Sequence, residues 1–497
     1  MQLSSLIKDI PDKTVINFRD LEITSIRYDS RAVERGSLFV ALPGARDDGH
    51  NFIDAAIDQG AVAIIGQYRA SNNNSLPVIL VPDTRKALAQ LSSAFYGDPS
   101  ASMKLVGITG TDGKTTTTFM TAALLQGAGR HAGLISTVAV KIGEEFLWNE
   151  TGYTTPEAPE IQETLARMRD AGVEYVALET SSHSLALDRV GSCQYDVAVV
   201  TNITSDHLDF HGTWEEYFNA KAKLFQMLHN DRKKPGPLVN LLNADDSSFE
   251  RLAGVVKGRT ITYGIRSPAE VTASNIEHRR GGSSFTLKTP AGETWIDLNM
   301  PGEYNIYNCL AAASVALSQG ITLDDIRATI SKGIAVPGRM QRVDKGQPFD
   351  VIVDYAHAPN GLRQALSTLR LGARGKVIVV FGCAGERDPA RRFGMGHAAG
   401  ELADFTVLTM DDPRSEDPND IIQEISLGLK EAGRTEGKDF IRIVDRREAI
   451  RHALSMARPN DIVLLAGMGH ERRMLIGNER LPWNEVEIAG EILEGMR

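Results

Sequence analysis

The segment KLVGITGTDGKTTTTFMTAALLQGAG, residues 104–129, combines an apolar strand, a glycine-rich turn and a helix. Glycines allow backbone N–H groups to close around phosphate oxygens, and the start of the helix adds partial positive charge. Lys114 is suited to neutralising β- and γ-phosphates, and Thr115 to offering its hydroxyl to Mg²⁺. Position 108 is Ile where the standard P-loop pattern has Gly. The strand–turn–helix context nevertheless favours a phosphate loop over a turn that only joins two elements.

Apolar strands alternate with helical patterns through the rest of the chain. After the phosphate loop, strands are expected at YVALETS (175–181) and YDVAVVTNI (195–203), and helices at APEIQETLARMRDAG (158–172) and TWEEYFNAKAKLFQML (213–228). Beyond the break at Pro337-Gly338, strands are expected at FDVIVDYA (349–356), GKVIVVFGC (375–383), DFTVLTM (404–410) and DIVLLAG (461–467), with helices from Gly361, near Met395 and from Pro418. This alternation predicts parallel sheets covered by helices. No GxGxxG follows the first strand of the last region, so a nicotinamide cofactor is not indicated.

The first hundred residues have shorter elements. Strands are expected at ITSIRYDS (23–30), GSLFVALPG (36–44), AVAIIGQ (61–67) and LPVILVPD (76–83), followed by a helix at RKALAQLSSAFYG (85–97). The turn Gly97-Asp98-Pro99 is a plausible linker. At about 150 residues per domain, a chain of 497 residues predicts roughly three domains. We place them at residues 1–100, 101–336 and 337–497.

Composition excludes several classes of protein. Apolar residues make up 42% and charged residues 24%, which is typical of a globular protein and excludes collagen or whole-chain disorder. The formal net charge of -10 disfavours a nucleic-acid partner. No apolar stretch reaches the roughly 18 residues of a membrane span, and the start of the chain lacks a secretory signal pattern. Three widely spaced cysteines, Cys193, Cys309 and Cys383, indicate reduced thiols and a cytoplasmic location.

Three further residues are candidates for completing an ATP site, which needs ligands for Mg²⁺. Glu179 follows the apolar strand YVAL, where the strand end would point it at the loop, and His207 follows TNITSD in a similar place. Lys221 lies on the expected helix EEYFNAKAKLF. Taken singly, each has a simpler interpretation: an exposed acid, a turn histidine bonded to backbone, and a solvated helix lysine.

The order of motifs resembles that of the Mur ligases of peptidoglycan synthesis, most closely the members that add the third, diamino residue. The resemblance covers essentially the whole chain. The matching segments are TGTDGKTTT (109–117), LETSSH (178–183), TNITSDHLDFHG (201–212), the NxxN of Asn305 and Asn308, DYAHAPNGL (354–362), FGCAGERD (381–388) and GMGHE (467–471). One such motif would be weak, whereas seven in family order are specific. Asp112 stands where Asn is common in the family.

The resemblance implies an ATP site with Mg²⁺. The implied ATP-binding residues are Gly110, Thr111, Asp112, Gly113, Lys114, Thr115 and Thr116, with Asn305, Asn308 and Asp354 around adenine and ribose and His357 in the same motif as Asp354. Thr115 with Glu179 would hold one Mg²⁺, and His207 with Lys221 a second. Lys221 lies ten residues after His211, as does the family's carbamylated lysine, so N6-carboxylysine is expected there. Lys114, Glu179, His207 and Lys221 are the implied catalytic residues.

The resemblance also implies a site for a nucleotide sugar. YDSR (28–31), with Tyr28 and Ser30, and PGARDDGH (43–50) resemble the family's UDP-binding segments, although DSR alone would indicate only a turn. Thr154, Thr155, Ser181 and Arg189 match positions that hold the muramoyl-dipeptide. Leu187 stands where some relatives have Gln, so one polar contact is expected to be absent.

Family positions that contact the diamino acid are occupied by Arg387, Asp411, Asp412, Pro413, Arg414, Gly467 and Glu471. Arg414 is suited to pairing with the distal carboxylate that diaminopimelate has and lysine lacks, and Glu471 to pairing with the distal ammonium. Relatives that add diaminopimelate usually have Asn at position 412. Asp412 leaves lysine and ornithine open, because its carboxylate can engage Arg414 or favour a cationic amine.

These features predict a monomeric ATP-dependent amide ligase of three α/β domains: a small UDP-binding domain, a central P-loop domain with a parallel sheet, and a C-terminal Rossmann-like domain. It would add a diamino acid, meso-diaminopimelate first, to UDP-N-acetylmuramoyl-L-alanyl-D-glutamate through an acyl phosphate. One alternative is a folylpolyglutamate synthase-like ligase, which YDSR and GARDDGH disfavour. Others are a P-loop ATPase that drives a partner, with no role for Arg414, and a non-catalytic scaffold, which intact Lys114 and Glu179 disfavour.

Overall fold

The structure is a computed structural model that describes residues 1–44, 47–69, 75–229, 234–279 and 281–496. Contacts divide the chain into two compact units, Met1–Val271 with Ala311–Thr322, and Thr272–Leu310 with Leu323–Arg497. Within the described ranges, no helix combines the length and the apolar character needed to cross a membrane. Residues 45 and 46 of the expected nucleotide-sugar segment 43–50 lie outside the described residues.

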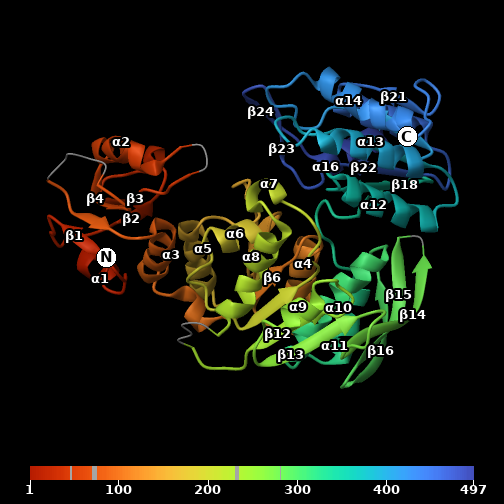
Figure 1. Ribbon diagram of the computed structural model, residues 1–497. Helices are drawn as coiled ribbons and strands as arrows, with labels where there is room; N and C mark the ends of the chain where they lie inside the picture. Colours follow the sequence, from red (N-terminus) through yellow and green to blue (C-terminus); the bar gives the residue numbers. More distant parts are fainter. Residues whose placement is uncertain (45–46, 70–74, 230–233, 280, 497) are drawn as a thin grey trace. The chain divides into compact units, whose positions relative to one another are not determined.

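The first unit begins with a five-stranded sheet, drawn in red to orange in Figure 1. Its strand order is β1-β5-β4-β3-β2. Its strands are β1 (Thr14–Ile16), β2 (Ser25–Arg27), β3 (Ser37–Val40), β4 (Ala61–Gly66) and β5 (Val78–Leu80). Its helices are α1 (Leu3–Leu6), η1 (Ser30–Ala32), η2 (Gly49–Phe52), α2 (Ile53–Asp58) and α3 (Thr84–Phe95). The Asp83 side chain accepts the N–H groups of Arg85 and Lys86, which explains why α3 begins there. The four strands and the helix expected from the sequence are all present.

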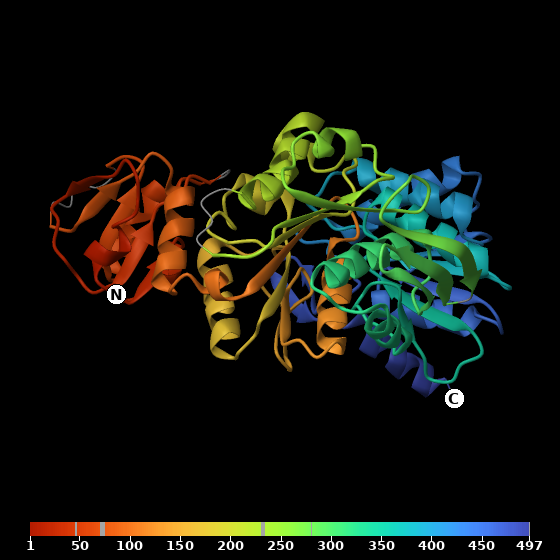
Figure 2. The same ribbon diagram turned by 90° about the horizontal axis from the view of Figure 1, so that it is seen from below.

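A second sheet in the same unit carries the phosphate loop. Its strands in this unit have the order β13-β12-β11-β6-β10-β7-β8-β9. They are β6 (Lys104–Thr109), β7 (Ala132–Ile135), β8 (Ala139–Ile142), β9 (Glu145–Trp148), β10 (Tyr175–Glu179), β11 (Val197–Val200), β12 (Val239–Asn243) and β13 (Arg259–Gly264). The helices are η3 (Pro99–Ser102), α4 (Lys114–Gly127), α5 (Ala158–Asp170), α6 (Ser182–Ala186), α7 (Leu208–His211), α8 (Trp214–Met227) and α9 (Phe249–Ala253). Helix α5 packs beside α3 (Figures 1 and 2).

The expected parallel arrangement holds for the strands from β13 to β7, and β8 and β9 depart from it. β10 and β11 flank β6 in parallel, and β12 and β13 continue in the same direction. β7, β8 and β9 pair antiparallel, because only short turns connect them and a parallel pair requires a long crossover. The chain leaves β6 toward one side of the sheet and returns to its other side at β11. The phosphate loop therefore lies where the strand order reverses, which is where ligands bind in such sheets.

The second unit contains a six-stranded sheet in the order β17-β18-β22-β19-β20-β21. The strands are β17 (Gln341–Val343), β18 (Asp350–Asp354), β19 (Val377–Phe381), β20 (Phe405–Leu408), β21 (Phe440–Arg442) and β22 (Ile462–Ala466). The helices are α12 (Pro359–Gly372), α13 (Ala390–Leu402), α14 (Pro418–Glu431), α15 (Arg446–Met456) and α16 (Glu485–Gly495). All neighbours from β18 to β21 run parallel, as expected, and only β17 is antiparallel. Helix α12 begins at Pro359, two residues before the expected Gly361.

Alternation along the strands of this sheet builds two cores. Val379 and Leu464 pack with α12, α13 and α14 on one face, while Val380 and Leu465 pack with α15 and α16 on the other. Successive strand residues point to opposite faces, so a continuous apolar run is needed to bury both. This explains why the strands VIVVF and IVLLA contain no polar residue.

Two groups of strands in the second unit are not anticipated by the sequence analysis. One is the antiparallel series β14 (Val271–Arg279), β15 (Gly282–Thr289) and β16 (Gly292–Leu298), followed by α10 (Glu303–Ser318), which belongs to both units, and α11 (Leu323–Ser331). The other is the hairpin β23 (Arg473–Ile476) and β24 (Glu479–Pro482). β14, β15 and β16 have nine, eight and seven residues but mix polar with apolar residues, and β23 and β24 have only four residues each. None of them contains the apolar runs from which strands were predicted.

Candidate active site

Glycine is required at both ends of the phosphate loop. Gly110 has φ +147°, and a Cβ there would lie 1.8 Å from Thr201 Oγ1. Gly113 precedes the first residue of α4 and has φ +82°, in the left-handed region. The loop is therefore shaped by backbone geometry that other residues would disturb.

Residues that follow β11 hold the loop from its neighbouring strand. The Thr201 hydroxyl donates to Asp112 O at 2.6 Å, and Asp112 N donates to Asn202 Oδ1 at 3.0 Å. Thr111 N donates to Asn202 O at 2.8 Å. Asp112 thus contributes backbone groups to the loop, so the departure from the family's Asn leaves these bonds in place.

Lys114 and Thr115 lie where the sequence analysis expects them. Lys114 Nζ donates to Gly110 O at 3.1 Å and Thr111 O at 2.8 Å, so the ammonium lies against its own loop. The buried Thr115 hydroxyl donates to Glu179 Oε1 at 3.0 Å. Glu179 also accepts the backbone N–H of Thr137 at 2.8 Å. A hydroxyl and a carboxylate oxygen therefore meet beside the loop.

Lys221 is buried rather than solvated, with 1% of its surface exposed. Its Nζ donates to Gly110 O at 2.6 Å and lies 4.4 Å from the centre of the Tyr217 ring. Burial, with the charge of Lys114 as a further cause, lowers the pKa of Lys221 well below its usual range. The simpler interpretation of a solvated helix lysine is wrong.

Three histidine rings gather beside Lys221 and Tyr217. The His183 ring centre lies 4.8 Å from that of His207 and 5.5 Å from that of His211. Burial is the main cause that lowers the pKa of all three, that of His183 to about 4. They are neutral near pH 7, the form in which imidazole binds metals. Only His207 was predicted from the sequence, although His183 lies in the quoted motif LETSSH and His211 in TNITSDHLDFHG.

The described residues contain no group of three or more His, Cys, Asp or Glu placed to hold a metal ion. Thr115 and Glu179 nevertheless offer oxygen donors, which Mg²⁺ prefers, next to a phosphate loop. The first expected metal position therefore fits the structure. The second, at His207 and Lys221, fits only when Lys221 carries an anionic group.

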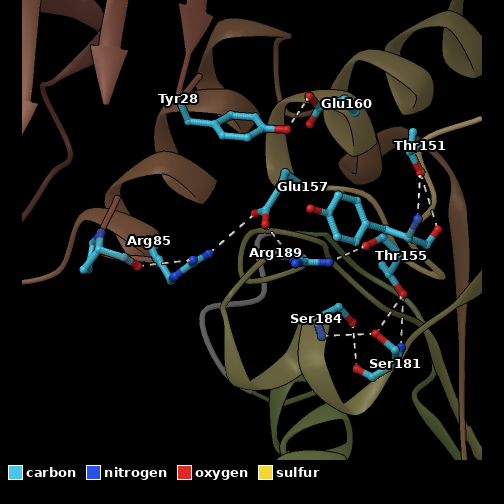
Figure 3. A network of polar contacts seen from close by, with 11 residues as sticks. Tyr28, Arg85, Thr151, Thr155, Glu157, Glu160, Ser181, Ser184 and Arg189 are labelled. Atoms are coloured by element: carbon cyan, nitrogen blue, oxygen red, sulfur yellow. Dashed lines mark hydrogen bonds and ion pairs between the residues drawn. The ribbon is translucent and has the colours of Figure 1, made fainter. Parts of the chain in front are cut away.

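Three residues expected to hold the muramoyl-dipeptide form one network (Figure 3). Arg189 Nη1 donates to Thr155 O at 3.0 Å, and Ser181 N donates to Thr155 Oγ1 at 3.1 Å. The Thr155 hydroxyl also donates to Glu179 O at 2.8 Å, at the end of β10. Thr154 is the half-buried neighbour of Thr155. The expected peptide site is thereby continuous with the expected metal position.

Carboxylates that the sequence analysis did not select complete this network. Arg189 Nε lies 2.8 Å from Glu157 Oε1, and Arg85 Nη1 lies 3.7 Å from Glu157 Oε2 (Figure 3). The Tyr28 hydroxyl donates to Glu160 Oε1 at 2.9 Å. Both acids lie within five residues of the quoted Thr155, which was the available signal. Tyr28 is therefore linked to α5.

Ser30, the other nucleotide-sugar candidate in the first sheet, begins the turn η1. The Asp29 side chain accepts the N–H of Arg31 and so caps this turn. Ser30 itself takes no part in the network around Arg189. Its expected role stays a prediction.

In the second unit, the residues expected to bind the diamino acid gather at the carboxyl ends of parallel strands. Asp411 follows β20 and Gly467 follows β22, and a Cβ at Gly467 would lie 2.4 Å from Asp411 Oδ2. Burial raises the pKa of Asp411 to about 6. Burial also raises the pKa of Asp412, against the opposing charges of Arg414 and Arg387. Pro413, which lies between Asp412 and Arg414 in the sequence, is also buried.

Asp412 bonds to a backbone group and makes no ion pair with Arg414. Its Oδ1 accepts Leu475 N at 2.9 Å, while Arg414 N donates to Leu475 O at 3.0 Å. The ion-pair partner of Arg414 among the described residues is Glu386, with Nη1 3.9 Å from Oε2. Of the two possibilities left open for Asp412, pairing with Arg414 is thus not observed. Hairpin β23–β24, which carries Leu475, supports the loop instead.

Glu471 is a further titratable group at this site. Burial is the largest cause that raises its pKa to about 7, followed by the charges of Asp412 and Asp411. The Tyr355 hydroxyl donates to Glu471 Oε1 at 3.4 Å. The pocket therefore combines arginine cations with an acid that ionises near neutral pH.

The residues expected around adenine and ribose lie in the second unit. Asn308 Nδ2 donates to Asn305 Oδ1 at 3.1 Å, and Asn305 Nδ2 donates to Pro301 O at 2.8 Å. Asp354 accepts Met340 N at 2.7 Å, and burial raises its pKa. These bonds are internal to the unit, so binding of ATP by these residues stays a prediction. His357, in the same motif, is exposed.

Comparison with known proteins identifies relatives over the full chain. Three family models match in order: "Mur ligase family, catalytic domain" over residues 22–96, "Mur ligase middle domain" over 108–316, and "Mur ligase, glutamate ligase domain" over 338–469. The chain is 42% identical over 490 residues to UDP-N-acetylmuramoyl-L-alanyl-D-glutamate–2,6-diaminopimelate ligase of Geobacillus kaustophilus, covering 98% of each chain. It is 41% identical over 502 residues to UDP-N-acetylmuramyl-tripeptide synthetase of Roseiflexus, covering 99% of each.

A solved structure of UDP-N-acetylmuramoyl-L-alanyl-D-glutamate–2,6-diaminopimelate ligase is similar over 95% of both chains, with a TM-score of 0.66 and 30% identity. Together with the three family models, it confirms the expected fold class of three α/β domains. The boundaries expected near residues 100 and 336 stay predictions.

We expect Gly110→Ala to weaken ADP binding by at least about tenfold, because the added Cβ displaces Thr201 and with it Asp112. Isothermal titration calorimetry measures the affinity. Gly129→Ala is the matched control, since Gly129 also has positive φ but has no atom within 4 Å of the added Cβ. Equal ADP affinity in both folded variants would contradict the assignment of the loop.

Proposed function

The chain belongs to the Mur ligase family, and from this premise we propose that it uses ATP to join meso-diaminopimelate to UDP-N-acetylmuramoyl-L-alanyl-D-glutamate. The observation that carries the proposal is the contact of Thr115 with Glu179 beside a loop whose Gly110 carbonyl accepts hydrogen bonds from both Lys114 and Lys221. A P-loop that only drives a partner would not need the network of Thr155, Ser181 and Arg189 next to it.

The proposed reaction has two steps. The free carboxylate of the D-glutamyl residue attacks the γ-phosphorus of ATP, which forms an acyl phosphate and releases ADP. The amine of the diamino acid then attacks the acyl carbon, and phosphate leaves as the amide forms and the amine loses a proton. Lys114 and the N-terminus of α4 stabilise the negative charge of the transferred group.

Thr115 and Glu179 are the residues that would hold Mg²⁺ at the phosphate loop. When bound, Mg²⁺ neutralises charge on the β- and γ-phosphate oxygens. Thr155 and Ser181 lie on the same network as Glu179 and would orient the dipeptide carboxylate. Such orientation supplies much of the rate in ligation reactions.

The environment of Lys221 supports its proposed carbamylation. Carbamylation forms a bond between Nζ and the carbon of CO₂ and releases a proton, so it requires a neutral amine. The Lys221 amine meets this requirement, because burial of Nζ disfavours its charged form. The product would give His207 the anionic partner that a second Mg²⁺ needs.

The proposed choice of amino acid rests on Arg387 and Arg414. Arg414 Nε is buried and lacks a hydrogen-bond partner among the described residues, so the guanidinium is available to a carboxylate. Asp412 makes no ion pair with Arg414 among the described residues, and one of its carboxylate oxygens accepts Leu475 N. Lysine and ornithine remain the alternative substrates. Both are disfavoured, because neither carries a distal carboxylate for Arg414.

The proposal places the enzyme in the cytoplasm, which supplies ATP and keeps thiols reduced. Cys193, Cys309 and Cys383 are all free and buried, in agreement with that compartment. We expect a monomer. The full-length relatives disfavour a folylpolyglutamate synthase-like ligase, because their similarity includes the first hundred residues.

The decisive test is phosphate release with UDP-muramoyl-dipeptide, ATP and each of meso-diaminopimelate, lysine and ornithine. We expect diaminopimelate to be preferred by roughly a thousandfold, because lysine has no distal carboxylate for Arg414, whose ion pair with Glu386 is long at 3.9 Å. Arg414→Ala should lower kcat/KM for diaminopimelate far more than for lysine. Preference for lysine or ornithine, or equal loss for both substrates, would contradict the pocket assignment and leave the ligase assignment intact.

Lys221→Ala should reduce turnover by at least about a thousandfold, and a short carboxylate such as acetate should restore part of it. Incubation of the wild-type protein with ¹³CO₂ should give one carbamate carbon resonance that Lys221→Ala lacks. Lys223→Ala is a control on the same helix, since Lys223 bonds to Asp188 instead. Full activity of the Lys221 variant would refute the carbamate.

The KM for the diamino acid should fall as pH rises from 6 to 8. The pKa of Glu471 is about 7, raised from its ordinary value, so the side chain is neutral below this pH and anionic above it. Only the anion attracts the substrate ammonium. Glu471→Gln should have a higher KM that changes much less with pH, and steady-state kinetics at several pH values would show whether the two profiles differ.

A further inference from the structure

The two arginines proposed to bind the diamino acid lie on different loops. Arg387 lies between β19 and α13, and Arg414 lies between β20 and α14. Gly385 N donates to Asp412 O at 2.8 Å and joins the loops. A Cβ on Gly385 would lie 2.1 Å from Pro413 O, so the two backbones are in close contact. The relative position of the arginines therefore depends on what holds these loops together.

Glu416 connects both loops to a buried cation. One carboxylate oxygen accepts the N–H of Glu386, the residue before Arg387. Nη2 of Arg392, on α13, donates to both oxygens of Glu416 at 3.0 and 2.8 Å. The Arg392 side chain is only 4% exposed, and its Nη1 donates to Glu424 at 3.1 Å. The Glu416 carboxylate therefore accepts hydrogen bonds from the first loop and from α13, and its Oε1 accepts from both donors.

The loops need such support because both contain strained backbone. Glu386 has φ +55° and Arg414 has φ +53°, in the left-handed region that disfavours side chains. Residues keep this conformation where surrounding contacts over-determine it. Leu475 O and Gly477 N bond to the backbone of Arg414, and Glu416 provides the corresponding bond to Glu386. The Glu386 N–H, with Arg392, also lowers the pKa of Glu416, which is therefore anionic at neutral pH.

We propose that Glu416 is a positioning residue for the diamino acid, which fixes loop 382–389 so that Arg387 keeps its place beside the loop of Arg414. The inference rests on the proposed function and assigns the residue that sets the geometry of its amine site. Glu416 acts through the Glu386 backbone and Arg392. The sites for ATP and the nucleotide sugar do not depend on it.

The test compares Glu416→Ala with Glu424→Ala in the full-length protein. Both variants remove a carboxylate partner of Arg392, but only Glu416 bonds to loop 382–389. We expect Glu416→Ala to raise the KM for meso-diaminopimelate at least tenfold and to leave the KM values for ATP and UDP-muramoyl-dipeptide within twofold. Glu424→Ala should stay within twofold for all three. Glu416→Gln should recover part of the loss, because its amide oxygen still accepts the Glu386 N–H.

Several outcomes would overturn the inference. Equal effects of the two alanine variants, or a parallel rise of all three KM values, would show that the carboxylate only supports the fold. A fall in kcat without a change in the KM for the diamino acid would also exclude positioning of that substrate. A wild-type protein that ligates none of the three amines would overturn the proposed function itself, which separates that failure from this one.

Discussion

The close approach of Gly110 to Thr201 is the contact on which the first unit depends. It brings the ends of β6 and β11 together at the point where the strand order reverses. Thr201 and Asn202 then hold the backbone of Asp112, which sets the direction in which α4 begins. Because Gly110 also presents its carbonyl to Lys221, one glycine fixes both the phosphate loop and the buried amine.

Much of this arrangement follows from local sequence. Apolar runs predicted β6, β10 and β11, and parallel neighbours bring their carboxyl ends to one edge, so Glu179 was expected near the loop. The parallel strands β7, β12 and β13 of the same sheet were not predicted. The burial of Lys221 did not follow, because a lysine on a helix gives no sign of which neighbours cover it. The family resemblance, rather than periodicity, directed attention to it. The pairing of Glu157 with Arg189 likewise joins residues from separate segments, which no local pattern records.

In the second unit, too, contacts between distant segments could not be predicted from local sequence. The motifs DDPR and GERD predicted Arg414 and Arg387 as binding residues. Nothing in those motifs indicated that Asp412 bonds to Leu475 on a later hairpin. Strand pairs formed by short, polar segments escape detection because they bury little apolar surface and show weak alternation. The hairpin nevertheless supplies the backbone groups that hold Arg414.

A buried ion pair between Arg446 and Glu485 connects helix α16 to the strands that carry the amine site. Arg446 and Glu485 are fully buried side chains, 2.7 Å apart, and Trp483 Nε1 donates to the same carboxylate at 2.7 Å. Arg446 also donates to Met410 O and Ala466 O, the residues immediately before Asp411 and Gly467. Such a pair adds little net stability, since desolvation offsets the attraction, whereas loss of one partner costs roughly 3–5 kcal/mol. Its value here is geometric: it ties the ends of β20 and β22 to α16, so that a helix without any expected site residue helps to define the amine pocket.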